Sequence, residues 1–201
     1  MKKEYLRRSL VIILHEIYGI NDHINFCSDV WIKEGFEVLT PNLLHRKSFT
    51  YAEGDKAYHY FMNEIEFKKS LQEVKDVVDT NRDIYEHIYI IGFSIGATIA
   101  WLSSEHEVDG IIAYYGSRIR NYVEVEPRCP ALLFFSNEKS FNVLDLGMQL
   151  KTKAKSVVEI IEAEHGFMNP YYKAYNANEY NKCMKISIDF FKRIEEGSVL
   201  Q

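Results

Sequence analysis

Short apolar runs of four to six residues alternate with longer amphipathic segments along the chain. A continuous apolar run of this length is typical of a strand buried on both faces, whereas the longer segments have the 3.6-residue period of helices. We expect strands at 9–14, 36–39, 88–92, 110–115, 131–135 and 156–161, and helices at 22–34, 55–79 (with a break near its middle), 95–104, 142–152 and 178–196. The alternation predicts an α/β fold with a mostly parallel sheet and helices on both faces.

Length and composition narrow the class of protein. The chain has 201 residues, so we expect residues 1–201 to form one domain. Hydrophobic residues make up 47% and charged residues 26%, which excludes fibrous and disordered proteins. The net charge of -5 gives no basic surplus for a nucleic-acid partner. No apolar stretch approaches the ~18 residues of a membrane span, so we expect no membrane partner.

The cysteines and the N-terminus bear on location. Cys27, Cys129 and Cys183 are an odd number without a C-x-x-C pair, which indicates no disulfide framework and fits the reducing cytoplasm. The apolar run at 10–14 follows basic residues, as in a secretory signal, but it is too short for the hydrophobic region of one. We therefore interpret this run as a buried first strand and expect a cytoplasmic protein.

The segment at 91–96 carries the strongest chemical signal. A buried strand runs into Gly92-x-Ser94-x-Gly96, and a helix follows. Glycines on both sides of a serine permit the sharp turn of a nucleophile elbow, which exposes the hydroxyl above the sheet edge. The Ile95 backbone N–H then lies at a helix N-terminus, where it can donate to an oxyanion. The alternative is a glycine-rich turn with a structural serine.

A serine nucleophile needs a base, and His165 has the right place. It follows the last predicted strand, precedes the final helix and comes after Ser94, the chain order of this type of triad. The other histidines are less suited, because His23, His59 and His106 are expected on solvated helix surfaces, His45 in a loop and His87 before a strand.

The pentapeptide at 15–19, His-Glu-Ile-Tyr-Gly, follows the first strand. It lacks the second histidine of the zinc motif H-E-x-x-H, because Gly19 stands there, so we expect no metal site. A strand-end loop of this kind suits an oxyanion hole instead. The Ile17 N–H would be its second donor, opposite that of Ile95.

Together, four segments resemble the dienelactone hydrolase family of α/β-hydrolases. They are residues 15–19, 92–96, 114–116 (Tyr-Tyr-Gly) and 165–167 (His-Gly-Phe), in the order and spacing of that family. The resemblance implies an α/β-hydrolase sheet without a separate lid domain and hydrolysis of an ester or lactone through an acyl-enzyme, with no metal or organic cofactor. It also implies that Glu16 hydrogen-bonds near the nucleophile and that Tyr115 lines the site. Among other loop aromatics, we expect Phe167 to contact the substrate.

The chain departs from the family at three places. Ser94 stands where the founding enzymes have cysteine, which points to general esterase chemistry. Lys139 occupies the probable position of the triad aspartate. Glu138 beside it would orient His165 if the loop shifts by one residue, and the alternative is that Glu138 is simply a solvated loop carboxylate. Asn137 and, more remotely, Asp145 are the other candidates for the group that orients His165.

The third departure concerns substrate recognition. Two arginines that bind dienelactone in the founding enzymes have no counterpart, since residues 53–56 read Glu-Gly-Asp-Lys and Asn169 replaces the second. We therefore do not expect dienelactone as substrate. Arg118 and Arg120 would serve an anionic substrate or are simply solvated.

The sequence thus predicts a small serine hydrolase, monomeric or homodimeric, that cleaves a small ester or lactone. Ser94, His165, Glu138 and Glu16 are its catalytic candidates. The alternative is a binding or regulatory protein on a hydrolase scaffold with impaired catalysis, favoured by Lys139 in the acid position.

Overall fold

A computed structural model describes residues 9–198 and contains a six-stranded sheet in the order β2-β1-β3-β4-β5-β6. The strands are β1 Ser9–Leu14, β2 Glu37–Leu39, β3 His87–Phe93, β4 Gly110–Tyr114, β5 Ala131–Asn137 and β6 Ser156–Glu164. All neighbouring strands run parallel. Their carboxyl ends therefore meet at one edge of the sheet, where active sites of such folds are built.

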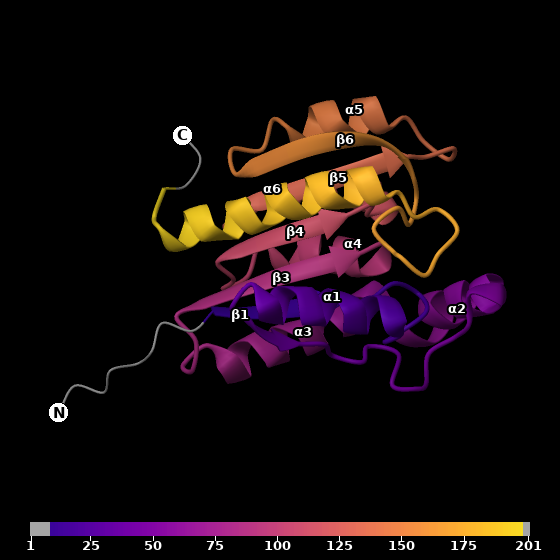
Figure 1. The fold of residues 1–201 in the computed structure, drawn as a ribbon, viewed down its shortest axis with the longest axis horizontal. Helices are drawn as coiled ribbons and strands as arrows, with labels where there is room; N and C mark the ends of the chain where they lie inside the picture. Colours follow the sequence, from indigo (N-terminus) through magenta and orange to yellow (C-terminus); the bar gives the residue numbers. More distant parts are fainter. Residues whose placement is uncertain (1–8, 199–201) are drawn as a thin grey trace.

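Helices cover both faces of the sheet, as expected. They are α1 Asp22–Lys33, α2 Gly54–Tyr60, α3 Phe67–Asn81, α4 Ile95–Ser103, α5 Val143–Leu150 and α6 Ala177–Glu195, with the short turns η1 Tyr51–Glu53, η2 Phe61–Ile65 and η3 Ser117–Asn121. Figure 1 shows α1 and α6 in front of the sheet and α4 behind it. The predicted α/β architecture is confirmed.

The core divides into two apolar layers because successive strand side chains point to opposite faces. In β1, Leu10 and Ile12 belong to the layer that also contains residues of α3, α4 and α5, whereas Val11 and Ile13 belong to the layer that contains residues of α1 and α6. All six residues of β1 are buried. This double burial explains why the strand sequence is continuously apolar rather than alternating.

The predicted break in the segment at 55–79 is confirmed. After α2, the chain forms one turn of π-helix, in which the Glu66 N–H donates to the Phe61 carbonyl at 2.8 Å. Glu66 then adopts a φ of 66°, which no helix continues through, and α3 begins at Phe67.

Within residues 9–198, no helix is both long enough and apolar enough to cross a membrane.

Candidate active site

The turn between β3 and α4 exposes Ser94 at the carboxyl edge of the sheet. Ser94 has φ 56° and ψ -109°, a strained conformation for a residue with a side chain. The turn is tight: a Cβ on Gly92 would lie 2.1 Å from the Gly96 carbonyl oxygen, and a Cβ on Gly96 2.3 Å from the Leu14 carbonyl oxygen. Both glycines of the motif are therefore required by close backbone approach.

Three polar side chains form a contact chain at this edge. Ser94 Oγ lies 3.0 Å from His165 Nε2, and His165 Nδ1 lies 2.7 Å from Glu138 Oε1. With the proton on Nδ1, the imidazole donates to Glu138 and accepts from the serine hydroxyl. The Glu138 side chain is 13% exposed and that of His165 38%, so the carboxylate is shielded while the imidazole stays accessible.

Strand register brings Glu138 to His165. Asn137 at the end of β5 pairs with Glu164 at the end of β6, so the next residue of each strand leaves the sheet beside the other. An irregularity precedes this pair, since β6 advances four residues from Ile160 while β5 advances two from Phe135. The Ser136 hydroxyl also donates to Glu138 Oε1, at 3.4 Å.

The other residues considered for the acid position lie elsewhere. Lys139 and Asn137 are exposed, and Asp145 is exposed on α5, beside Arg120 and Phe141. Within the described residues, none of the three forms a hydrogen bond or ion pair with the His165 side chain. Of the alternatives open for the acid position, the structure places Glu138 beside His165 Nδ1, and the irregular register of β5 and β6 accounts for the one-residue shift from Lys139.

The loop after β1 lies against the elbow. Gly96 approaches the Leu14 and His15 carbonyl oxygens, and a turn closed by the Gly19 N–H on the Glu16 carbonyl follows at 3.1 Å. Ile17 lies within this turn. In the described part of the chain, the Ile17 N–H and the Ile95 N–H at the start of α4 are without a hydrogen-bond partner. Both donors are therefore free to bind an oxyanion.

The His15 side chain links the loop after β1 to the segment at Leu43 through hydrogen bonds. Its Nδ1 lies 2.6 Å from the Glu16 carbonyl oxygen, and its Nε2 accepts from the Leu43 N–H at 3.1 Å. An imidazole with one donor and one acceptor contact is neutral. Burial lowers the pKa of His15 to about 4, which agrees with that state.

Glu16 lies in a buried polar network beneath His165. Its carboxylate accepts from the Tyr115 hydroxyl at 3.0 Å and from Asn169 Nδ2 at 3.4 Å, and His23 Nδ1 lies 3.7 Å away. Burial raises the pKa of the Glu16 carboxyl, but His23, His165 and Tyr115 together lower it by more, so the pKa lies below its usual range. Glu16 is therefore a buried carboxylate anion.

Tyr115 and Phe167 differ from the expectation that they contact the substrate. Both side chains are fully buried. The Tyr115 ring packs 4.8 Å from the His165 ring and 5.6 Å from the Phe167 ring, between centroids. Tyr115 and Phe167 pack beneath His165, and in this structure neither side chain is exposed to a ligand.

His23 also differs from expectation, since it was predicted on a solvated helix surface and is 1% exposed. The sequence does hold a signal for this burial: His23, Cys27 and Trp31 follow at four-residue intervals on α1, and all three are buried.

Aromatic side chains of the loops meet around this edge. Tyr51 packs against Tyr18 and Tyr172, with ring centroids 4.9 and 5.3 Å apart, and its hydroxyl accepts from Asn169 Nδ2 at 2.9 Å. The loop before α2 thus contacts the stretch that follows His165.

Arg118 and Arg120 belong to η3, which follows the carboxyl end of β4. Arg118 donates to the Tyr58 hydroxyl, and Arg120 donates to the Ser117 carbonyl and lies over the Phe141 ring. Within residues 9–198, neither has a carboxylate partner.

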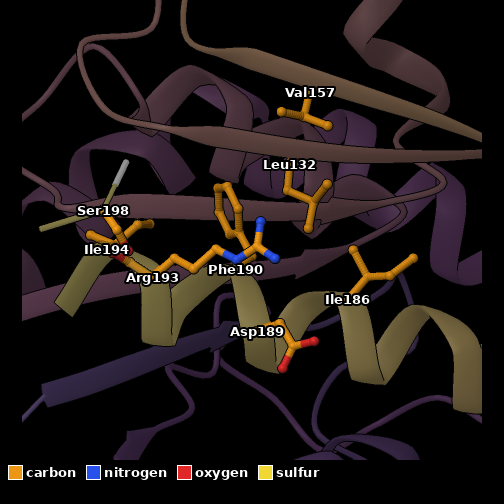
Figure 2. Close-up of a pocket in the computed structure, with 8 residues that line it drawn as sticks. All are labelled: Leu132, Val157, Ile186, Asp189, Phe190, Arg193, Ile194 and Ser198. Carbon is orange, nitrogen blue, oxygen red and sulfur yellow. Dashed lines mark hydrogen bonds between the residues drawn. The ribbon is translucent and has the colours of Figure 1, made fainter. Parts of the chain in front are cut away.

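The apolar cavity of about 180 Å³ shown in Figure 2 is a separate feature. Ile186, Phe190 and Ile194 of α6 face Leu132 and Val157 across it. Leu132 and Val157 are the second residues of β5 and β6. The cavity therefore lies near the amino ends of the strands, at the opposite edge from Ser94.

Within residues 9–198, no group of three or more His, Cys, Asp or Glu side chains is arranged to hold a metal ion.

Known sequences and structures show the family and the fold of the chain. The sequence model of the dienelactone hydrolase family matches residues 1–195. The chain belongs to this family. It is therefore a member of a hydrolase family, and such a family acts on small molecules.

Relatives cover most of the chain. The Bacillus subtilis protein named uncharacterized protein YczH is 41% identical over 184 residues, 89% of this chain and 90% of that protein. A proposed carboxymethylenebutenolidase of Yersinia pestis is 23% identical, over 90% of this chain and 77% of that protein. The crystal structure of a proposed dienelactone hydrolase from Klebsiella pneumoniae has a TM-score of 0.76 at 18% identity, over 92% of this chain and 86% of that one. At such identity, the structural match shows the shared α/β-hydrolase fold.

Proposed function

We propose that this protein is a serine hydrolase that cleaves a small carboxylic ester or lactone through an acyl-enzyme. The single observation that carries the proposal is the contact chain from Ser94 Oγ to His165 Nε2 and from His165 Nδ1 to Glu138 Oε1, at 3.0 and 2.7 Å. A serine hydroxyl is a weak nucleophile unless an adjacent base takes its proton.

The proposed reaction has two halves. Ser94 Oγ attacks the carbonyl carbon while His165 Nε2 takes the hydroxyl proton, and the Ile17 and Ile95 N–H groups bind the oxyanion. Glu138 stabilises the imidazolium formed in this step. His165 then protonates the leaving alcohol and later activates a water molecule that hydrolyses the acyl-enzyme.

The substrate is proposed to be small and not to be dienelactone itself. Asn169 stands where the founding enzymes have a substrate-binding arginine, and here it donates to Glu16 and Tyr51. Between β2 and α3 the chain holds only the short elements η1, α2 and η2, and between β4 and β5 only η3, so we propose that loops and short helices form the substrate site. Against the alternative of a binding protein with impaired catalysis, Lys139 is exposed and the carboxylate of Glu138 contacts His165 Nδ1.

We also propose a cytoplasmic location and a monomeric or homodimeric state. Supporting the location, all three cysteines are unpaired and buried.

The experiment is active-site labelling. The protein is treated with a fluorophosphonate probe, and the adduct is located by peptide mass spectrometry. We expect one adduct, on Ser94, and none in Ser94→Ala, whose folding is checked by circular dichroism. Ser103→Ala is the matched control, because the buried Ser103 hydroxyl donates to the Ile99 carbonyl at the far end of α4 from Ser94 and should leave labelling intact. Absence of labelling from neutral to alkaline pH would refute the serine-hydrolase proposal.

A further inference from the structure

His23 is a buried side chain that the proposed reaction does not use. Its Nδ1 has no hydrogen-bond partner within the described residues. That atom faces the Glu16 carboxylate, with Oε2 at 3.7 Å, and the imidazole packs edge-on against the ring of Phe93, centroids 4.6 Å apart. Phe93 directly precedes Ser94, so His23 supports the elbow from the α1 side of the sheet.

Glu16 needs a positive partner at this depth. Its two hydrogen-bond donors, the Tyr115 hydroxyl and the Asn169 amide, are neutral. A buried carboxylate anion is costly unless a charge compensates for the lost hydration. A protonated His23 at 3.7 Å supplies that charge, at a separation that allows a direct ion pair.

We propose that His23 is a protonated positioning residue that keeps Glu16 anionic, so that Glu16 acts through Tyr115 on the catalytic histidine. This inference rests on the proposed function of Ser94 and His165. It assigns His23 to the reaction although it touches neither substrate nor reacting atom.

The connection from Glu16 to His165 passes through Tyr115. The hydroxyl of Tyr115 donates to Glu16 Oε1, and its ring packs against the His165 imidazole. Tyr115 has a φ of 44°, a strained value for a tyrosine. The hydrogen bond to Glu16 anchors the side chain in this conformation. Glu16 also interacts electrostatically with His165, so its negative charge favours the imidazolium formed when Ser94 is deprotonated.

Most groups around this network stay in one protonation state near neutral pH. The titratable groups that face Glu16 are His15, Tyr18, His23, Tyr51, Tyr115 and His165, from the loops after β1, β4 and β6, from α1 and from η1. Burial lowers the pKa of His15 to about 4 and raises that of Tyr18 to about 12, and the pKa values of Tyr51 and Tyr115 are also raised. Among these neighbours, His23 and His165 are the ones whose positive charge lowers the pKa of the Glu16 carboxyl.

The first test is direct. In protein labelled with ¹⁵N-histidine, the ring nitrogen shifts report the protonation state of His23, which is assigned by comparison with His23→Gln. We expect an imidazolium at pH 7. A neutral His23 at pH 7 would overturn the proposal whether or not the protein hydrolyses esters. Conversely, a protonated His23 without ester hydrolysis would leave the His23–Glu16 pair intact and refute the proposed function.

The second test is the pH profile of kcat/KM for a neutral activated ester. Removing either member of the pair neutralises the other, so His23→Gln, Glu16→Gln and the double variant should share one acid limb. We expect this limb to lie roughly 0.5–1 pH unit below that of the wild type, because the anion nearest His165 is lost. His59→Gln, on the exposed side of α2, is the matched control and should keep the wild-type limb. An unmoved limb in folded His23→Gln, or additive shifts in the double variant, would overturn the proposal.

Discussion

Glu138 Oε1 and His165 Nδ1 lie 2.7 Å apart, although 27 residues separate them in the chain. The contact joins the ends of two neighbouring strands, and the shielded carboxylate has a better electrostatic interaction with an imidazolium than a solvated one would. This relationship carries the first prediction.

Glu138→Gln should lower kcat for short-chain esters by roughly 10²–10⁴-fold, because an amide cannot stabilise the imidazolium and can hold His165 in the wrong tautomer. KM should change little, since Glu138 reaches the substrate only through His165. The measurement is steady-state kinetics at pH 8.

Lys139→Gln is the matched control for that prediction. Lys139 neighbours Glu138 in the loop but is exposed, so we expect kcat within about 2-fold of the wild type, as for surface changes away from special features. Equal losses in both variants would show that the loop, and not the Glu138 carboxylate, is what matters.

Gly96→Ala should prevent the elbow from forming. The added Cβ would lie 2.3 Å from the Leu14 carbonyl oxygen, and backbone on both sides has to move. Overpacking of this kind costs typically 1–3 kcal/mol, and we expect the upper part of that range together with loss of fluorophosphonate labelling. Urea unfolding measures the free energy.

Gly147→Ala on α5 is the counterpart of that substitution. Its Cβ would meet the flexible end of Ile160 at 3.3 Å, and alanine favours a helix by up to about 1 kcal/mol over glycine. We expect stability unchanged or slightly raised. A large loss here and none in Gly96→Ala would contradict the packing at the elbow.

The fold could be predicted because each buried strand corresponds to a largely apolar run in the sequence. The proposed nucleophile, base and oxyanion loop could also be predicted, since Ser94 and His165 immediately follow β3 and β6 and Ile17 lies three residues after β1. The boundaries differ by a few residues, most at β6, which runs on to Glu164 instead of ending at 161.

Which residue contacts His165 Nδ1, and which side chains pack beneath His165, depend on tertiary geometry. Whether Glu138 or Lys139 faces His165 is decided by an irregular register between two strands, which no local pattern encodes. Tyr115 is buried because its φ of 44° turns the chain at the end of β4, a conformation that propensity does not predict for tyrosine. The burial of His23 follows from the four-residue spacing of His23, Cys27 and Trp31 on α1, whereas its residue type favours a solvated position.

Thiol reagents should leave both protein and activity intact. Burial raises the pKa values of Cys27, Cys129 and Cys183 to about 12, so their thiolates are scarce at pH 8. We expect almost no reaction with an aromatic disulfide reagent in the native state and three thiols per chain in denaturant. One rapidly reacting thiol that abolishes ester hydrolysis would instead indicate a cysteine nucleophile.

Stability should fall as the pH drops below the ordinary pKa of histidine, because His15 is neutral in the folded protein. Burial lowers its pKa from 6.5 to about 4, so between these values the unfolded chain binds a proton that the folded one does not. By linkage, the free energy of unfolding then decreases as pH falls through this window, by about 3 kcal/mol in total from this group.

His15→Gln keeps a donor and an acceptor but cannot titrate, so its unfolding free energy should depend less on pH. Urea unfolding between pH 7 and 4 measures both curves, and His59→Gln serves as the control that keeps the wild-type slope. Parallel curves for wild type and His15→Gln would mean that His15 does not hold its neutral state against acid.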